Sequence, residues 1–300
     1  MKYCGLFSAT RTRAIRGLHL AFLLLLISIG AAATSPAQSK NSEYTTPANA
    51  VDSEDFYRVY DYDTPAKGWF EPNFWITYVP SSRGDYGAFY KTWDREHLTA
   101  YTTELEYGVT DHFSLSAYVD FINAQGENGA AGTGLRFTQG RIEARYRFSK
   151  PKAHFFDTAA YLEYHLPAKS YADSQEMETR VILERNFKNL RLDLNPSLSF
   201  YTTGSERGNA PTANFNTGIY YERNAKVQPG AEYYAGYGEL GNIPSLRYQQ
   251  HLVFGTTDFN LHRGLTLQFG IGYGLTHHSD RVTVKSILSY EFNGLHRSED

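Results

Sequence analysis

Apolar and polar residues alternate along most of this chain. In residues 141–148, RIEARYRF, arginine or glutamate occupies every odd position and an apolar residue every even one. Successive side chains of a β-strand point to opposite faces, so such a strand has one charged and one apolar face. The pattern recurs in about twelve segments. The predicted strands are 68–79, 98–109, 113–122, 134–148, 154–166, 175–187, 190–202, 213–222, 226–237, 248–256, 264–275 and 281–292.

The connections between these segments alternate in length. Long polar or glycine-rich loops, such as residues 80–97, alternate with short turns, such as Thr110-Asp111 and Lys188-Asn189. The only sizeable connection on the short side is TDFNLHR, residues 257–263. Outer-membrane barrels have short periplasmic turns and longer outer loops, whereas a soluble sandwich has no reason to keep this asymmetry. We therefore predict an all-β protein, a single antiparallel transmembrane β-barrel of about twelve strands.

The N-terminus has the features of a secretory signal peptide. Four basic residues precede an apolar stretch at residues 18–29, and small residues follow it. The apolar stretch is too short for a transmembrane anchor, which needs about 20 residues. We predict a cleaved signal peptide at 1–37, a periplasmic tail at 38–67, the barrel at 68–292 and a C-terminal periplasmic tail at 293–300. The only cysteine, Cys4, lies in the predicted signal peptide, which argues against disulfides and thiol chemistry.

Composition narrows the class further. Hydrophobic residues make up 41% of the chain, and no stretch after the signal is long enough for a membrane-spanning helix. The 24 Tyr and 19 Phe suit aromatic girdles at the two membrane interfaces. Without the four basic residues of the signal, 25 Lys and Arg remain against 32 Asp and Glu, a net charge of −7. An acidic surface gives no reason to expect nucleic-acid binding.

If the apolar register faces lipid, the charged register faces the lumen. An arginine or lysine on the lipid face costs roughly 2–4 kcal/mol near the midplane, which fixes the two faces. Arg185 is the exception, near the periplasmic end of its strand, where its head group can reach the interface. The predicted lumen-lining residues are Glu104, Glu106, Asp120, Arg141, Glu143, Arg145, Arg147, Glu163, Glu178, Arg180, Arg191, Asp193, Glu222 and Glu232.

The mixed signs of these charges allow two interpretations. Arginines and carboxylates of neighbouring strands can pair and fill a narrow lumen, or they can line a water-filled channel with a mild preference for cations. We favour pairing for any single residue, because about twelve strands enclose a lumen little wider than side chains need. The tail of 30 residues at 38–67 is too short to form a plug domain.

Catalytic and metal-binding alternatives rest on Ser279, with His277, His278 and Asp280 beside it. Some outer-membrane barrels hydrolyse lipids with serine and histidine, but neighbouring residues alone do not form a triad, and the local lipase signatures are absent. The same histidines, with His251, are a weak metal-binding candidate. We predict no catalytic residues, no metal site and no cofactor.

A structural or adhesin-like barrel is a further alternative. Its candidate surface is the first long loop, which carries Tyr86, Phe89, Tyr90 and Trp93.

Two stretches carry a family resemblance. YDYDTPAKGWFEPNFWITY at 60–78 and TELEYGVTDHFSLSAYVDF at 103–121 resemble an uncharacterised family of bacterial outer-membrane barrels. More distantly, they are similar to the barrels described as transporters of the phenol meta-cleavage pathway. From the barrel pattern, the signal peptide and the polar register we predict a passive channel for small solutes in the outer membrane of a Gram-negative bacterium, with lipid, lipopolysaccharide and the barrel-assembly machinery as partners. The resemblance adds a general label of transport. It leaves the oligomeric state open.

Overall fold

The computed structural model describes residues 56–83, 85–88, 91–125 and 134–294, without the side chains of 85–88, 91–94 and 124–125. The predicted signal peptide and the first part of the predicted tail lie outside these residues. The strands are β1 (Trp69–Ser81), β2 (Asp85–Ala88), β3 (Lys91–Thr110), β4 (Phe113–Gln125), β5 (Arg136–Arg147), β6 (Asp157–Pro167), β7 (Glu176–Phe187), β8 (Leu190–Tyr201), β9 (Thr212–Tyr221), β10 (Val227–Glu239), β11 (Gln250–His262), β12 (Leu265–Gly274), β13 (Val282–Tyr290) and β14 (Phe292–Asn293).

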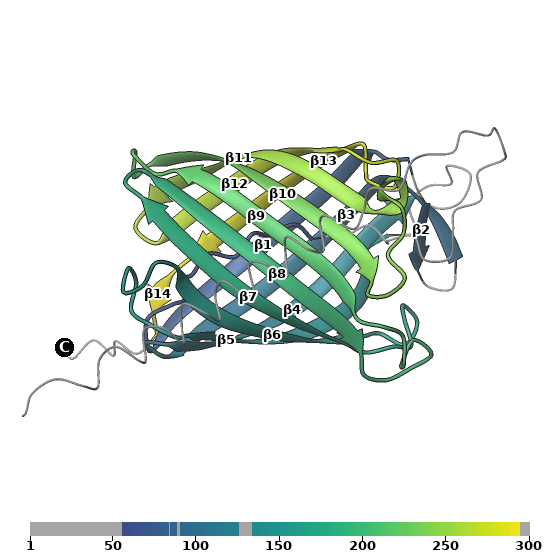
Figure 1. The fold of residues 1–300 in the computed structure, drawn as a ribbon, viewed down its shortest axis with the longest axis horizontal. Helices are drawn as coiled ribbons and strands as arrows, with labels where there is room; N and C mark the ends of the chain where they lie inside the picture. The colour runs from purple at the N-terminus through teal and green to yellow at the C-terminus, as the bar shows by residue number, and fades with distance from the viewer. Residues whose placement is uncertain (1–55, 84, 89–90, 126–133, 295–300) are drawn as a thin grey trace, which may run out of the picture. The chain divides into compact units, whose positions relative to one another are not determined.

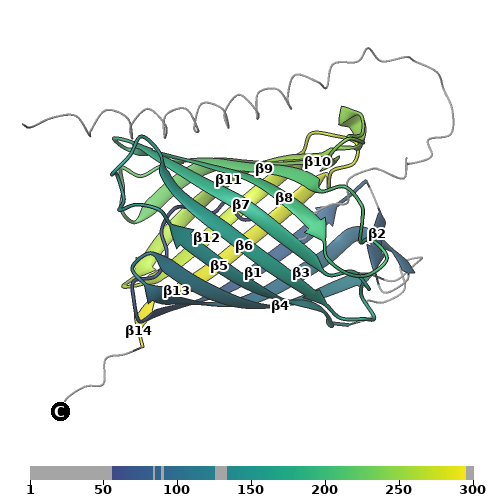
Figure 2. The ribbon, with the colours of Figure 1, turned by 60° about the horizontal axis from the view of Figure 1, so that its bottom comes forward.

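The strands close into one barrel (Figures 1 and 2). Its 12 antiparallel strands are β1 and β3 to β13, and each pairs with its neighbours in sequence. β1 pairs with β13 in the register Phe74↔Leu288 and Trp75↔Ile287, and on its other side with β3. This closure confirms the predicted barrel and strand count. Because β1 pairs on both sides, none of the 12 strands is left as a sheet edge, as a membrane interior requires.

Two short strands extend the barrel at its ends. β2 pairs with the first part of β3 as a hairpin at the long-loop end, and β14 pairs with the start of β1 at the other end. The described part of the chain contains no helix long and apolar enough to cross a membrane.

The alternation of long and short connections is present, with two corrections: on the short side the β5–β6 connection covers residues 148–156, and the predicted turn at 257–263 is mostly strand. Residues 257–263 were predicted to be a turn, but β11 continues to His262, and only residues 263–264 separate it from β12. Phe259 pairs with Leu267 on one side and Val227 on the other. The apolar period fails in this stretch because it lies near the periplasmic end of its strand, where polar residues lie outside the apolar band.

The outward register forms the lipid-facing surface. Exposed apolar residues on it include Tyr146, Ile219, Phe269 and Leu288, each more than 40% exposed. At the periplasmic end, Arg185 donates to the Phe155 carbonyl at 2.8 Å. Its guanidinium also lies 4.4 Å from the Phe155 ring centre. The predicted exception is therefore held by aromatic and main-chain partners of the adjacent turn.

We expect Phe269→Arg to impair insertion by roughly 2–4 kcal/mol, because it places a charge on the lipid face. The yield of folded, heat-modifiable barrel in vesicles measures this effect, with Phe269→Leu as the matched control. Equal yields from the two variants would contradict the assignment of faces.

Candidate functional site: the occupied lumen

The predicted lumen-lining side chains all belong to the inward register of the barrel. Ten of the fourteen are buried, and Arg147, Glu178, Arg191 and Glu222 are partly buried. Lys285, on β13, is a further buried inward cation. The structure joins these residues through ion pairs, so the local pairing that we favoured describes their geometry.

The lumen also holds a stretch of the chain that the sequence analysis placed in the periplasm. Residues 56–66, called here the lumen segment, run inside the barrel and reach β1 through a turn in which the Trp69 amide donates to the Ala66 carbonyl. Tyr57, Tyr60 and Tyr62 are at most 4% exposed. The prediction of a periplasmic tail is therefore wrong for this part, and so is the expected narrow lumen. A barrel of 12 strands is wider than its own inward side chains fill, and the lumen segment occupies the remaining space.

The wall holds the main chain of the lumen segment through side chains. Asn195 accepts a hydrogen bond from the Tyr60 amide at 2.7 Å and donates to the Tyr60 carbonyl at 2.9 Å. Glu184 accepts from the Tyr62 amide at 2.9 Å. An unpaired buried peptide group is costly, so these bonds make it possible for a chain outside the sheet to lie in the interior.

Two further wall residues bond carbonyls of the same segment. Lys285 donates to the Tyr57 carbonyl at 3.3 Å, and Arg145 donates to the Asp63 carbonyl at 3.0 Å. Carboxamide, carboxylate, ammonium and guanidinium groups from β5, β7, β8 and β13 thus bind one extended piece of main chain.

Side chains of the lumen segment alternate between two halves of the wall. Tyr57 and Val59 pack with Tyr234, Leu252 and Phe254 of β10 and β11. On the opposite side, the Tyr60 ring lies 4.9 Å from the Tyr161 ring of β6. The segment therefore divides the lumen along its length and contacts both halves.

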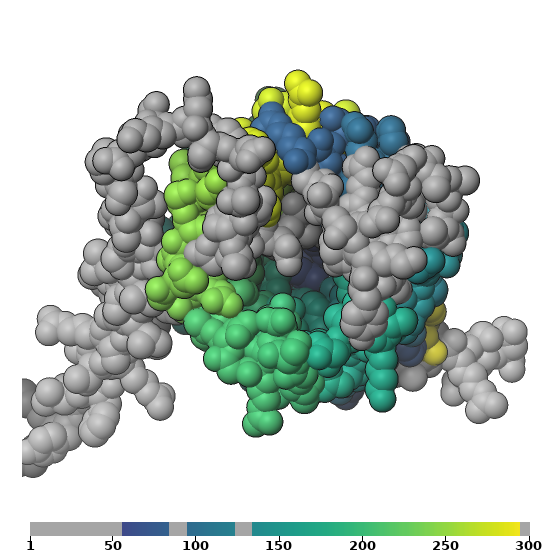
Figure 3. Space-filling model, turned by 90° about the vertical axis from the view of Figure 1, so that its right-hand side faces the viewer, coloured from purple at the N-terminus to yellow at the C-terminus, as the bar shows by residue number. Residues whose placement is uncertain are grey.

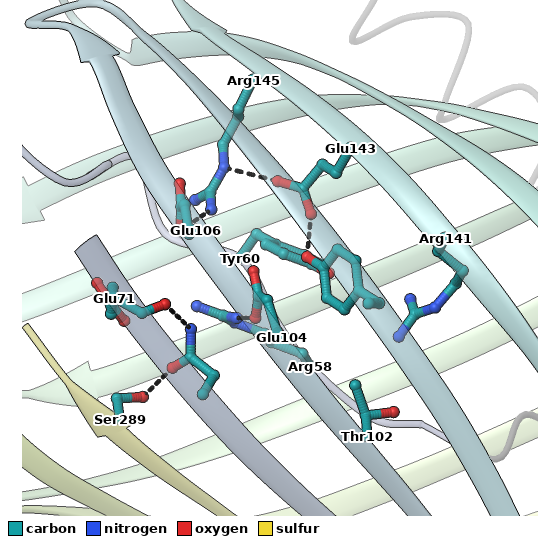
Figure 4. Close-up of polar contacts among 12 residues, drawn as sticks. Arg58, Tyr60, Glu71, Thr102, Glu104, Glu106, Arg141, Glu143, Arg145 and Ser289 are labelled. Atoms are coloured by element: carbon teal, nitrogen blue, oxygen red, sulfur yellow. Dashed lines mark hydrogen bonds and ion pairs between the residues drawn. The ribbon is translucent and has the colours of Figure 1, made fainter. Parts of the chain in front are cut away.

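Arg58 and Arg145 anchor the charged part of this arrangement (Figure 4). Arg58 pairs with Glu104 at 2.9 Å. Arg145 pairs with Glu106 at 2.9 Å and with Glu143 at 3.2 Å, and all three side chains are at most 2% exposed. Two carboxylates and the Asp63 carbonyl thus surround one guanidinium.

A second group, from β4, β5 and β6, lies nearer the outer end of the barrel. Arg141 forms a two-pronged pair with Asp120, at 2.7 and 3.1 Å, and contacts Glu163 at 3.0 Å. Its guanidinium carbon lies 4.2 Å from the centre of the Tyr118 ring. Buried charges are tolerated when they are paired and hydrogen-bonded in this way.

Further ion pairs repeat the pattern around the rest of the wall. Arg191 pairs with Asp193 and Glu222, both at 3.0 Å. Lys285 pairs with Glu232, which also accepts hydrogen bonds from Tyr220 and Tyr234 at 2.8 Å. Arg180 pairs with Glu178 at 2.6 Å, and its guanidinium carbon lies 4.6 Å from the Tyr60 ring centre.

At the periplasmic end, the lumen segment passes tightly against Gly108. A Cβ atom at this position would lie 2.1 Å from the Ala66 carbonyl oxygen and 2.4 Å from that of Pro65. The Gly68 amide donates to the Gly108 carbonyl at 2.7 Å. The segment is thus attached at the periplasmic rim and extends from there into the lumen.

The opposite mouth carries the long loops. Figure 3 shows a recess at this end, with dark purple atoms in its depth, the colour of the first described residues. Two of the loops are joined by Asp173, which accepts hydrogen bonds from the Ser205 hydroxyl at 2.9 Å and from Ser174 at 3.0 Å. These bonds, the one from Ser205 first, lower the pKa of Asp173 because they stabilise its carboxylate.

Ser279, the centre of the catalytic alternative, holds two parts of the chain together. The Ser279 hydroxyl accepts from the His251 amide at 2.8 Å, donates to the His251 carbonyl at 3.1 Å and lies 2.6 Å from the Thr276 hydroxyl. The His251 ring nitrogens contact the Tyr233 hydroxyl and the Gln249 side chain. Ser279 thus joins the β12–β13 loop to the start of β11.

Neighbouring Asp280 accepts from Arg95 at 2.7 Å. Within the residues that the structure describes, no group of three or more His, Cys, Asp or Glu is arranged to hold a metal ion. Of the first-loop aromatics, the side chains of Tyr86, Phe89, Tyr90 and Trp93 lie outside the described residues.

Sequence analysis missed the lumen segment, Asn195 and several inward tyrosines. Tyr118, Tyr161, Tyr220 and Tyr234 are buried, although we assigned the abundant tyrosines to interfacial girdles. Their signal was present, because each shares the odd or even register of a lumen carboxylate two residues away, as Tyr118 does with Asp120. Asn195 carries no charge and gave no comparable signal.

Comparison with known proteins identifies the fold. No protein-family model matches the sequence, and no curated protein matches it. Among solved structures, the chain is similar to the COG4313 outer membrane channel from Pseudomonas putida F1, with a TM-score of 0.56 and 12% identity over 77% of this chain and 98% of that one. It is also similar to the KdgM porin, with a TM-score of 0.50 and 9% identity over 74% of this chain and 99% of that one. The chain has the fold of Gram-negative outer-membrane barrels, as the family resemblance implied.

Proposed function

We propose that this protein is a passive outer-membrane channel for small solutes. One observation carries the proposal: a closed barrel has an apolar register towards lipid and a continuous polar, charged register towards its lumen. A polar, charged interior can hydrate an ion or solute path, which an apolar interior cannot do. The fold shared with an outer-membrane channel and a porin supports this class.

The charge of the wall favours cations. Nine of the fourteen predicted lumen residues are acidic and five are basic. Most of these charges are paired, so the preference is weak. The lumen segment leaves little open cross-section, and the conductance of the full chain is therefore small.

Planar bilayers containing the refolded full chain test the proposal. We expect small, stable conductance steps with a mild preference for potassium over chloride. A folded barrel that conducts neither as the full chain nor without the lumen segment would contradict the channel function.

The filled lumen favours a second candidate, a purely structural or adhesin-like barrel, which that result would support. A chemical step forms no part of the proposal, because the Ser279 hydroxyl is bonded to the main chain of His251. Lipid hydrolysis that Ser279→Ala abolishes would instead support the hydrolase alternative.

The proposal includes the export of the chain and its insertion into the outer membrane. Residues 1–37 serve as the export signal, and the apolar belt contacts outer-membrane lipid and lipopolysaccharide after insertion by the barrel-assembly machinery. Neither a cofactor nor a metal ion is needed for passive transport.

A further inference from the structure

We propose that the lumen wall is a binding site for an extended polypeptide, that residues 56–63 are its own exchangeable ligand, and that their release opens the conduction path. The inference rests on the proposed channel function, whose regulation it assigns. Its basis is the way in which the wall binds main chain as well as side chains.

Polar side chains of the wall recognise the main chain of the lumen segment. Five hydrogen bonds from Asn195, Glu184, Lys285 and Arg145 reach amides and carbonyls between Tyr57 and Asp63. Asn195 bonds both the amide and the carbonyl of Tyr60, as a neighbouring strand would. Any buried main chain needs such partners. Here side chains of the wall supply them, as in a site that accepts an extended polypeptide.

The sheet of the barrel closes without the lumen segment. The described lumen segment has no place in the sheet, and β1 pairs with β3 and β13 without it. Removing the segment leaves every strand pair of the barrel in place. Its covalent connection to the barrel is at the periplasmic rim, beside Gly108, and we infer that it leaves the lumen by pivoting there.

Release of the lumen segment frees a path through the lumen. Arg58 and Tyr60 reach Glu104 of β3 and Tyr161 of β6. Tyr57 packs on the other half of the wall, against Tyr234 and Phe254 of β10 and β11. While the segment spans the lumen, it leaves little cross-section for solutes. Water that enters after its release solvates the exposed carboxylates and guanidiniums, which keeps their desolvation from penalising the open state.

The decisive experiment compares three chains in planar bilayers. One is the full chain, one lacks residues 41–63, and the matched control lacks only residues 41–52 and keeps the lumen segment. We expect the first deletion to raise single-channel conductance several-fold and the control deletion to leave it unchanged. Equal conductance in all three chains would overturn the inference while leaving the channel function intact. No conductance in any of them would overturn both.

A peptide added in trans tests the binding site itself. A synthetic peptide of residues 54–66, added on the periplasmic side, is expected to block the shortened channel in a concentration-dependent way. The same peptide with an N-methyl group on the Tyr60 amide cannot donate to Asn195, and it should block about tenfold more weakly. A scrambled peptide that blocks equally well would contradict specific recognition.

If the shortened chain does not assemble, Asn195→Leu in the full chain tests the same point. This substitution keeps the branched shape and the number of side-chain heavy atoms, and it removes both bonds to Tyr60. Higher conductance or frequent opening events are expected. Conductance indistinguishable from that of the full chain would overturn the inference.

Discussion

Replacing Arg145 with methionine is expected to lower the free energy of unfolding by about 3–5 kcal/mol, because it leaves buried carboxylates without their cation. Glu106 and Glu143 both contact the Arg145 guanidinium, and none of the three is more than 2% exposed. The same change removes the hydrogen bond to the Asp63 carbonyl. Urea titration of the chain folded in vesicles, followed by tryptophan fluorescence, measures the loss.

Arg147→Met is the matched control. Arg147 is on the same face of the same strand, but its partner Asp63 has a side chain that is 77% exposed. An ion pair with an exposed partner contributes at most about 1 kcal/mol. The combined variant Arg145→Met, Glu106→Gln and Glu143→Gln should recover much of the stability, since it removes the uncompensated charges. Similar losses for Arg145→Met and Arg147→Met would show that the buried group has no special role.

The barrel could be predicted from the sequence because its signal is local and repeated. Each strand shows its two faces through the alternation of its own residues, as residues 141–148 do. The free-energy cost of a charge in lipid decides which face is outside. The alternation of loop lengths then orders the strands without knowledge of any contact. These arguments hold for each strand separately, so an error at one end, as at residues 257–263, does not spread.

The occupied lumen could not be predicted in the same way, because it depends on distant residues. The bonds between Tyr60 and Asn195 join positions 135 residues apart. Nothing near residues 56–63 shows that their peptide groups have partners. The sequence FYRVYDYD is rich in aromatic residues for a solvated tail, and that enrichment was the available clue. Local pattern describes how a strand presents its faces, but not what fills the space that a set of strands encloses.

Glu104 should dominate the ion selectivity of the channel that lacks residues 41–63. In the full chain its carboxylate is fully buried and pairs with Arg58 at 2.9 Å. Deletion removes Arg58, whereas Glu106 and Glu143 keep Arg145, and Asp120 and Glu163 keep Arg141. Glu104 then adds an uncompensated negative charge to a hydrated lumen, where fixed charges bias which ions pass.

We expect the shortened channel to be more cation-selective than the full chain, as measured by reversal potential in a potassium chloride gradient. Adding Glu104→Gln to the shortened channel should remove most of this increase. Glu206→Gln is the control, because Glu206 is an exposed carboxylate of the loop between β8 and β9, whose effect salt screens. Equal shifts from the two substitutions would mean that selectivity arises from surface charge, and that ions do not pass Glu104.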